Sequence, residues 1–340
     1  MVTTIQWCGD RVRYLDQQCL PLAEVYRETD RYTDIADAIR RLSIRGAPLI
    51  GVAAAYGVAL AVLHAGRDGM TEREALGRSS AILLATRPTA VNLAWALNRV
   101  ALACRNFSGD GGLATRCLAI AREIHDEDIR MCRAIGDAGA PLIPAGARIL
   151  THCNAGALAT GGSGTALAVI AAAHREGKVR AVFASETRPA FQGARLTAWE
   201  LQKAGIQVTV VTDSTAAFLM QKGEIDLVIV GADRIASNGD TANKIGTFSH
   251  AVAARVHKLP FYIAAPGSTV DGSIADGSAI PIEERAAEEL TVLNGTRIAP
   301  PGIGVYAPAF DVTPASFISA IITDRGIVRP PYNFAGGVRG

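Results

Sequence analysis

Hydrophobic and polar positions change their spacing near residue 140 of this 340-residue chain. Before that point apolar residues recur at helical spacing, and after it short apolar runs alternate with amphipathic segments. The first part is expected to hold a short antiparallel pair near residues 5–14 and helices at residues 33–42, 47–63, 71–85, 90–105 and 112–138. The change in spacing predicts two domains, residues 1–139 and residues 140–340.

The second part has the pattern of repeated β-α-β units. Apolar strands are expected at residues 147–151, 179–184, 207–212, 226–230 and 261–264, with crossover helices at residues 164–175, 190–204, 215–221 and 243–257. Crossovers of this length join neighbouring strands in parallel. The predicted class is α/β, with a parallel-sheet domain preceded by a smaller, mainly helical N-terminal domain.

Composition and charge limit the classes of function. Hydrophobic residues make up 49% of the chain and charged residues 19%, which indicates a large buried core rather than disorder. The net charge of +2, without a run of basic and interleaved aromatic residues, argues against a nucleic-acid partner. The six cysteines include no CxxC pair, which disfavours a metal site, and their wide spacing is typical of reduced, cytoplasmic thiols. The charged N-terminus lacks the apolar core of a signal peptide.

The uncharged stretch at residues 47–63 is the candidate for a membrane segment. It is slightly short for a span, is rich in alanine and glycine, and has no flanking aromatic anchors. A buried helix that packs closely through small residues is therefore favoured, and no membrane partner is expected.

Polar side chains recur where each predicted strand of the second part ends. These segments are 151–156, 185–192, 212–215, 231–234 and 265–269. The carboxyl ends of parallel strands meet at one edge of a sheet, and ligands bind in the crevice beyond that edge. The sequence therefore predicts an enzyme whose active site lies there.

Cys153 ends the first of these strands and precedes the glycine-rich run Gly161–Gly164. Backbone N–H groups at a helix N-terminus lower the pKa of a thiol, although a free cysteine often simply packs in the core. The run itself could cradle a phosphate or form a tight turn, and it matches neither GxGxxG nor the P-loop. His152 is expected to point to the opposite face and to be structural.

Three further residues follow the fourth strand. Asp233 suits a general acid in an apolar site, or alternatively a helix cap or an ion pair with Arg234. Asn243 and Lys244 are expected where the next helix begins, and they suit an anionic or hydroxylated ligand. Lysine is disfavoured at a helix N-terminus by the helix dipole, so its presence there favours a functional role.

Two arginines lie in expected loops of the helical part. Arg45 precedes Gly46 and Ala47, and Arg87 precedes a proline. A pair of guanidinium groups could clamp a phosphate, whereas the alternative is that both are solvated surface residues.

Several long motifs extend from about Arg45 to Tyr332. They are RGAPLIGVAAAYG, RPTAVNLAWAL, THCNAGALAT, GGSGTALAVI, ASETRPAFQGARLTAWEL, VTDSTAAFLM, IVGADRIASNGDTANKIGT and APAFDVTP. Together they resemble the methylthioribose-1-phosphate isomerase family. The wider family includes the regulatory subunits of eukaryotic initiation factor two B and ribose-1,5-bisphosphate isomerase.

This resemblance implies specific roles for residues of the chain. It implies a catalytic pair, Cys153 and Asp233. The implied substrate contacts are Arg45, Gly46, Ala47, Arg87, Gln192, Asn243 and Lys244. It also implies a Rossmann-like second domain and a homodimer, without a metal or nucleotide cofactor.

The implied reaction is the isomerisation of 5-methylthioribose 1-phosphate to 5-methylthioribulose 1-phosphate in methionine salvage. One alternative is an isomerase of another sugar phosphate, such as 5-deoxyribose 1-phosphate or ribose 1,5-bisphosphate. The other is a non-catalytic regulatory subunit, against which the presence of both Cys153 and Asp233 argues. Proton transfer through Cys153 and a direct hydride shift both remain open as mechanisms.

Overall fold

The computed structural model describes residues 2–87, 90–107 and 112–336. Contacts divide the chain into a helical unit, Met1–Asp137 with Ala155–Ala168, and a sheet unit, Ala138–Asn154 with Val169–Gly340. The sequence predicted a single boundary between two domains at residue 139. In the structure the chain crosses between the units more than once, because residues 155–168 belong to the helical unit.

Long-range hydrogen bonds tie this returning segment to the start of the chain. The Thr4 hydroxyl donates to the Ala157 carbonyl at 2.9 Å, and the Gln17 amide donates to the Leu158 carbonyl at 2.8 Å. Contacts across so many residues leave no local pattern in the sequence, which is why the spacing of apolar positions did not reveal them.

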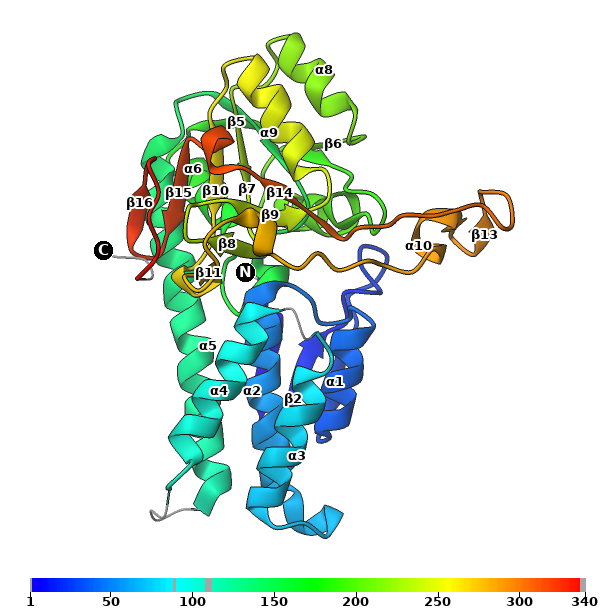
Figure 1. The fold of residues 1–340 in the computed structure, drawn as a ribbon, viewed down its shortest axis with the longest axis vertical. Helices are drawn as coiled ribbons and strands as arrows, with labels where there is room; N and C mark the ends of the chain where they lie inside the picture. Colours follow the sequence, from blue (N-terminus) through cyan, green and yellow to red (C-terminus); the bar gives the residue numbers. More distant parts are fainter. Residues whose placement is uncertain (1, 88–89, 108–111, 337–340) are drawn as a thin grey trace. The chain divides into compact units, whose positions relative to one another are not determined.

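The helical unit combines a small antiparallel sheet with long helices (Figure 1). Its strands are β1 (Ile5–Cys8), β2 (Arg11–Leu15) and β3 (Tyr26–Thr29), and its helices are α1 (Tyr32–Arg40), α2 (Ala47–Leu63), α3 (Glu72–Leu84), α4 (Val91–Cys104) and α5 (Gly112–Gly139). Short 3₁₀ turns lie at η1 (Ala65–Asp68) and η3 (Ala157–Ala159). The antiparallel pairing of β1 with β2 confirms the short pair expected near residues 5–14.

Helix α2 is the core of the helical unit. Its residues from Leu49 to Val62 are all buried, and it packs against α1, α3 and α4. A Cβ on Gly51 would lie 2.8 Å from the Asn92 carbonyl oxygen, so the close approach of α4 requires a glycine there. The buried helix expected at residues 47–63 is confirmed. Within the described ranges, no helix is both long and apolar enough to cross a bilayer.

The sheet unit is built on a seven-stranded sheet in the order β16-β15-β10-β7-β4-β5-β6. Its strands are β4 (Ala147–Thr151), β5 (Val179–Ser185), β6 (Val208–Val211), β7 (Leu227–Val230), β10 (Phe261–Ala264), β15 (Ala320–Thr323) and β16 (Gly326–Val328). All neighbours pair in parallel except β15 and β16, which pair antiparallel. Omitting β16, the strand order is that of a doubly wound α/β sheet, with its reversal point between β4 and β7.

Helices follow most of these strands, and a second sheet lies beside them. The helices are α6 (Ala166–Arg175), α7 (Ala198–Lys203), α8 (Thr215–Gln221), α9 (Thr247–Val256) and α10 (Glu288–Thr291), with shorter turns at η2 (Ala140–Leu142), η4 (Gly193–Thr197, a π-helical turn), η5 (Gly267–Thr269), η6 (Gly277–Ala279) and η7 (Ala315–Phe317). The second sheet has the order β11-β8-β9-β14, from β8 (Arg234–Ala236), β9 (Thr241–Lys244), β11 (Val270–Asp271) and β14 (Phe310–Thr313). A hairpin of β12 (Val292–Leu293) and β13 (Thr296–Arg297) extends away from the main sheet (Figure 1).

The expected helix at residues 243–257 is wrong at its start. Asn243 and Lys244 lie in β9, which pairs antiparallel with β14, and helix α9 begins only at Thr247. Gly246 separates the two elements with a φ of 103°, a conformation that favours glycine. The argument that a lysine opposes the helix dipole at this position therefore no longer applies.

Candidate functional site

The site is centred where the order of the main sheet reverses. Strands β4 and β7 are adjacent and parallel, with Ile149 opposite Leu227. Cys153 follows the end of β4, and Asp233 follows the end of β7. Ligands of doubly wound sheets bind beyond the strand ends at this reversal point. Cys153 and Asp233 therefore lie at the edge of the sheet where an active site is expected.

Cys153 is held in an unusual backbone conformation. Its φ is 61°, in the left-handed region that residues with a Cβ seldom occupy. Its N–H donates to the Thr187 hydroxyl at 2.9 Å, and its carbonyl accepts from the Thr197 hydroxyl at 2.6 Å. The residue is only partly buried. Such strain persists where the surroundings fix it, and it is common at active sites.

Asp213 anchors the loop that follows β5. Its carboxylate accepts from the Thr187 and Arg188 N–H groups, both at 2.8 Å, and from the Ser185 hydroxyl. Burial alone would raise the pKa of Asp213, but these three hydrogen bonds lower it below its usual value. Two residues of this loop, Thr187 and Phe191, also have positive φ, at 66° and 55°.

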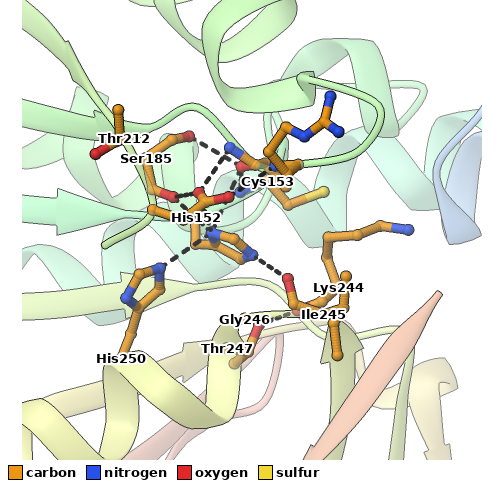
Figure 2. A network of polar contacts seen from close by, with 12 residues as sticks. His152, Cys153, Ser185, Thr212, Lys244, Ile245, Gly246, Thr247 and His250 are labelled. Carbon is orange, nitrogen blue, oxygen red and sulfur yellow. Dashed lines mark hydrogen bonds and ion pairs between the residues drawn. The ribbon is translucent and has the colours of Figure 1, made fainter. Parts of the chain in front are cut away.

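A buried pair of histidines lies beneath this loop (Figure 2). The Ile245 carbonyl, which can only accept, lies 2.8 Å from Nε2 of His152, so this nitrogen carries the proton. Nδ1 of His152 then accepts, and its donor is the Nε2–H of His250 at 3.2 Å, because the Ser185 hydroxyl, 2.9 Å away, gives its single proton to Asp213. Burial lowers the pKa of both rings, that of His250 to about 3. Both rings are therefore neutral, which agrees with the structural role expected for His152.

By spacing alone, His152, Asp213 and His250 could hold a metal ion, because their ligand atoms lie within 4.8 Å of one another. Hydrogen bonds from His250 and to the Ile245 carbonyl already occupy the ring nitrogens of His152, and backbone amides occupy both carboxylate oxygens of Asp213. A metal would have to replace those bonds, so the cluster is better explained as a hydrogen-bond network.

The second sheet brings Asp233 next to Asn243. The Asp233 N–H donates to the Ala242 carbonyl at 2.9 Å, within the pairing of β8 with β9. The Asn243 side chain donates to the Thr247 hydroxyl at 2.9 Å. Arg234, the alternative ion-pair partner of Asp233, forms a salt bridge with Asp271 at 3.4 Å.

Lys244 extends from the end of β9. Its amine lies 4.7 Å from the centre of the Phe310 ring, and Figure 2 shows it pointing to the same side of the network as the Cys153 thiol. The adjoining helix α9 is capped by Asp311, which accepts from the Gly246 and Phe248 N–H groups at 2.7 and 3.1 Å. Burial raises the pKa of Asp311 to about 6.

Gln192 ends the loop that Asp213 anchors, at the start of the π-helical turn η4. The next residue must be glycine, because a Cβ on Gly193 would lie 1.7 Å from the Ser185 carbonyl oxygen. The Gln192 side chain is buried, and its Oε1 has no hydrogen-bond partner among the described residues. Since buried polar atoms are nearly always paired, this oxygen is suited to accept a hydrogen bond from a ligand.

The remaining expected contacts belong to the helical unit. Arg45 is buried, with 7% of its surface exposed, and Arg87 is half-buried, so the solvated-surface alternative is wrong for Arg45. Gly46 caps α2 with a φ of 99°, and a Cβ there would lie 2.4 Å from the Cα of Ala159. Ala47 is the first residue of α2. The two residues after Arg87 in its expected loop, 88 and 89, lie outside the described residues.

The glycine-rich run is a structural turn rather than an open phosphate cradle. The Gly161 N–H donates to the Asp128 carboxylate at 2.5 Å. The Gly162 and Gly164 N–H groups donate to the Thr160 hydroxyl at 3.2 and 3.1 Å. Backbone donors that the protein already satisfies cannot also bind a phosphate, so the tight-turn alternative is favoured.

The structure therefore gathers five expected residues in the sheet unit, around the ends of β4, β5, β7 and β9: Cys153, Gln192, Asp233, Asn243 and Lys244. The polar groups beneath them were not assigned a role from the sequence. These are His250, Asp311, Ser185, Thr187 and Asp213. The sequence pointed to three of them, Ser185, Thr187 and Asp213, only through their positions after predicted strands.

Comparison with known proteins places this arrangement in a family. The model of the Initiation factor 2 subunit family matches residues 43–330. The chain belongs to this family. Among its relatives, the methylthioribose-1-phosphate isomerase of Pelotomaculum thermopropionicum is 56% identical over 340 residues, which cover 98% of this chain and 93% of that protein.

Two solved structures are similar to this chain over nearly its whole length. The 5-methylthioribose 1-phosphate isomerase of Pyrococcus horikoshii OT3 is 43% identical, with a TM-score of 0.89 over 98% of this chain and 94% of that chain. The translation initiation factor eIF-2B subunit delta from A. fulgidus is 41% identical, with a TM-score of 0.87 over 98% and 97%. The α/β fold is thus shared with both.

Proposed function

We propose that this chain converts 5-methylthioribose 1-phosphate to 5-methylthioribulose 1-phosphate, an aldose–ketose isomerisation of methionine salvage. The observation that carries the proposal is the match over 98% of the chain to a relative named methylthioribose-1-phosphate isomerase. The sheet topology supports it, because a thiol and a carboxyl group follow adjacent strands at the reversal of strand order.

The substrate sets the first chemical requirement. Its anomeric oxygen carries the phosphate, so the ring cannot open as a free hemiacetal does. An acid must protonate the ring oxygen as the bond between this oxygen and C1 breaks. We assign this acid to Asp233, which is half-buried at the end of β7. Opening leaves C1 electron-poor and Asp233 as a carboxylate.

Hydrogen must then move from C2 to C1, and two routes conserve atoms and electrons. In the first, the Cys153 thiolate removes the C2 proton, the electron pair forms a C1=C2 double bond, and the thiol returns the proton to C1. In the second, a hydride passes directly from C2 to C1. In both routes the C2 hydroxyl loses its proton to the Asp233 carboxylate. Solvent deuterium at C1 of the product supports the first route, and its absence favours either the hydride shift or a proton that Cys153 keeps shielded from solvent.

We assign the phosphate contacts to Arg45, Arg87 and Lys244. Gly46 and Ala47 add backbone groups at the N-terminus of α2, where the helix dipole favours an anion. Binding energy from this remote group can orient the sugar at the reacting carbons. Replacement of Arg87 by alanine is expected to raise KM strongly, and an unchanged KM would contradict the role.

We assign sugar hydroxyl contacts to Gln192 and Asn243. The unpartnered Oε1 of Gln192 supports an accepting role. The Asn243 side chain uses one donor on Thr247, and an amide nitrogen carries two.

The family resemblance motivates coarser proposals about organisation. Residues 1–139 would form a helical domain that supplies phosphate contacts, and residues 140–340 a Rossmann-like catalytic domain, in a cytoplasmic homodimer. Analytical ultracentrifugation tests the dimer, and a sedimentation coefficient that fits a single chain would contradict it.

Two alternatives need separate arms of the test. Another sugar phosphate, 5-deoxyribose 1-phosphate or ribose 1,5-bisphosphate, would keep the chemistry and change the pathway. A non-catalytic subunit is the other, since one similar structure is that of an initiation factor subunit.

The experiment supplies purified protein with each of the three sugar phosphates and measures ketose formation. Cys153→Ala and Asp233→Ala are assayed beside the parent chain, with Cys8→Ala as the matched cysteine control. The proposal expects the highest kcat/KM for 5-methylthioribose 1-phosphate and loss of turnover in the two site variants alone. Turnover of none of the substrates by the parent chain would make the non-catalytic alternative the leading one.

A further inference from the structure

We infer that Thr187 and Asp213 are positioning residues that hold the Cys153 thiol for reaction, a role that rests on the proposed isomerase function. Neither belongs to the residues assigned above to substrate contact. The inference follows from one chain of hydrogen bonds that runs from the Asp213 carboxylate through Thr187 to the Cys153 backbone.

Cys153 needs such support because its backbone is strained. The left-handed region is unfavourable for a residue with a Cβ, because the Cβ lies too close to the following carbonyl oxygen. Hydrogen bonds at both its N–H and its carbonyl oppose this cost, from Thr187 and Thr197 respectively. If the N–H bond is lost, the residue can relax toward ordinary angles, which turns the thiol away from its present direction.

The Thr187 hydroxyl must accept the bond from the Cys153 N–H, and of the two acceptors near its own proton, the Ser185 carbonyl is closer than Nδ1 of His152 at 3.5 Å. The hydroxyl has a single proton, which it donates to the Ser185 carbonyl at 2.9 Å. A lone pair is therefore left facing the Cys153 N–H. Thr187 is fully buried, so water cannot take the place of the hydroxyl. Valine has nearly the same shape without the hydroxyl, whereas serine retains it.

Asp213 fixes Thr187 in turn. Its carboxylate accepts from the N–H groups of Thr187 and Arg188, and Thr187 itself has a φ of 66°. Two consecutive amides on one carboxylate leave the loop little freedom to rotate the Thr187 hydroxyl away. Asparagine at position 213 replaces one accepting oxygen with a donor, so at least one of these bonds must break.

The test compares Thr187→Val, Thr187→Ser and Asp213→Asn with the parent chain. Thr209→Val is the matched control, because this exposed threonine of β6 undergoes the same change outside the loop. Three quantities are measured: kcat and KM of isomerisation, the melting temperature, and the rate at which iodoacetamide alkylates Cys153. Peptide mass spectrometry separates Cys153 from the partly exposed Cys8 and Cys19, which serve as internal references.

Thr187→Val and Asp213→Asn are expected to lower kcat by about 100-fold with little change in KM, because misplacement of a catalytic group acts on the chemical step. Both should also change the alkylation rate of Cys153 but not of Cys8 or Cys19. Thr187→Ser should restore both quantities, and Thr209→Val should leave them unchanged.

Parental kcat and alkylation rate in Thr187→Val overturn the inference. If that variant does not fold, Asp213→Asn decides alone, and parental values there overturn it equally. A melting temperature that falls as much in Thr187→Ser as in Thr187→Val, with kcat falling in proportion, indicates a merely structural role and also overturns it. Should the parent chain turn over no sugar phosphate, the proposed function fails, yet the alkylation rates still decide the positioning of Cys153.

Discussion

Two aspartates, the buried Asp128 and the half-buried Asp213, each hold a loop through its backbone amides, but burial and hydrogen bonding balance differently in the two. Asp128 of the helical unit accepts from one amide, that of Gly161, and burial raises its pKa to about 6. Asp213 of the sheet unit accepts from two amides and the Ser185 hydroxyl, and these bonds lower its pKa despite burial. Deep burial with one amide donor thus favours the protonated form of Asp128, whereas shallower burial with three donors favours the carboxylate of Asp213.

The loops that they hold differ in the same way. In the glycine-rich loop of the helical unit, Asp128 and Thr160 satisfy the amides of Gly161, Gly162 and Gly164. The loop at residues 186–192 instead contains left-handed residues that are not glycine, and it ends with a buried oxygen that has no partner in the described chain. The comparison teaches that glycine content predicts a tight turn whose amides the protein itself can satisfy. Backbone strain together with an unpaired polar atom instead makes a loop a candidate for ligand binding.

The largest effect is expected at the end of the strained loop. Gly193→Ala would place a Cβ 1.7 Å from the Ser185 carbonyl oxygen, which is backbone and cannot simply move aside. We expect the free energy of unfolding to fall by more than about 3 kcal/mol, since overpacking of this severity exceeds the usual range. Denaturant titration followed by circular dichroism measures it, together with loss of turnover.

Gly304→Ala is the control for that change, because a Cβ at this position of the sheet unit meets nothing within 4 Å and its φ is not in the left-handed region. Little change in stability is expected there. Equal stability of the two variants would show that the π-helical turn is not fixed by its contact with β5.

A smaller, pH-dependent effect is expected from Asp128 in the structural loop. Its folded-state pKa, about 6, lies above the ordinary value of 3.8, so the folded state keeps a proton that the unfolded state has released between these values. Its contribution to stability is therefore complete below about pH 4 and is lost as pH rises through 6, by at most about 3 kcal/mol. Asp128→Asn cannot titrate and should flatten this dependence.

Unfolding free energies of the parent chain and of Asp128→Asn, measured from pH 4 to pH 7, check this. Asp311 also has a pKa of about 6, so part of the slope should remain in the variant. Asp213 has the opposite sign: its contribution is present above about pH 4 and is lost as pH falls through its lowered pKa. Identical slopes in the two proteins would contradict the assignment to Asp128.

The smallest effect is expected at Gln192. Removal of an acceptor for one substrate hydroxyl should raise KM about tenfold, which corresponds to a single hydrogen bond. The melting temperature should hardly change, because Oε1 has no partner to lose among the described residues. Steady-state kinetics of Gln192→Ala measure this beside Gln202→Ala, an exposed glutamine of α7. An unchanged KM, or equal effects of the two variants, would remove Gln192 from the site.

Much of the architecture could be predicted because it follows from the local pattern of apolar residues. The buried strands β4 and β10 and the helix α2 have the predicted bounds, since elements buried on all sides are continuous apolar runs. The positions of Cys153 and Asp233 followed, because each lies directly after such a run. Strand β9 was missed, because its assignment depends on pairing with β14, far along the chain.

By itself, the sequence determined the α/β class, the order of the elements and the edge at which polar residues gather, because each follows from local spacing. Only the tertiary structure decided which polar groups form hydrogen bonds within the protein and so cannot bind a ligand. The Gly161 amide is satisfied by an aspartate 33 residues away, and the Cys153 amide by a threonine 34 residues away. Hydrogen bonds between distant residues have no local signature, so the sequence could nominate both loops but could not tell the structural turn from the loop that supports Cys153.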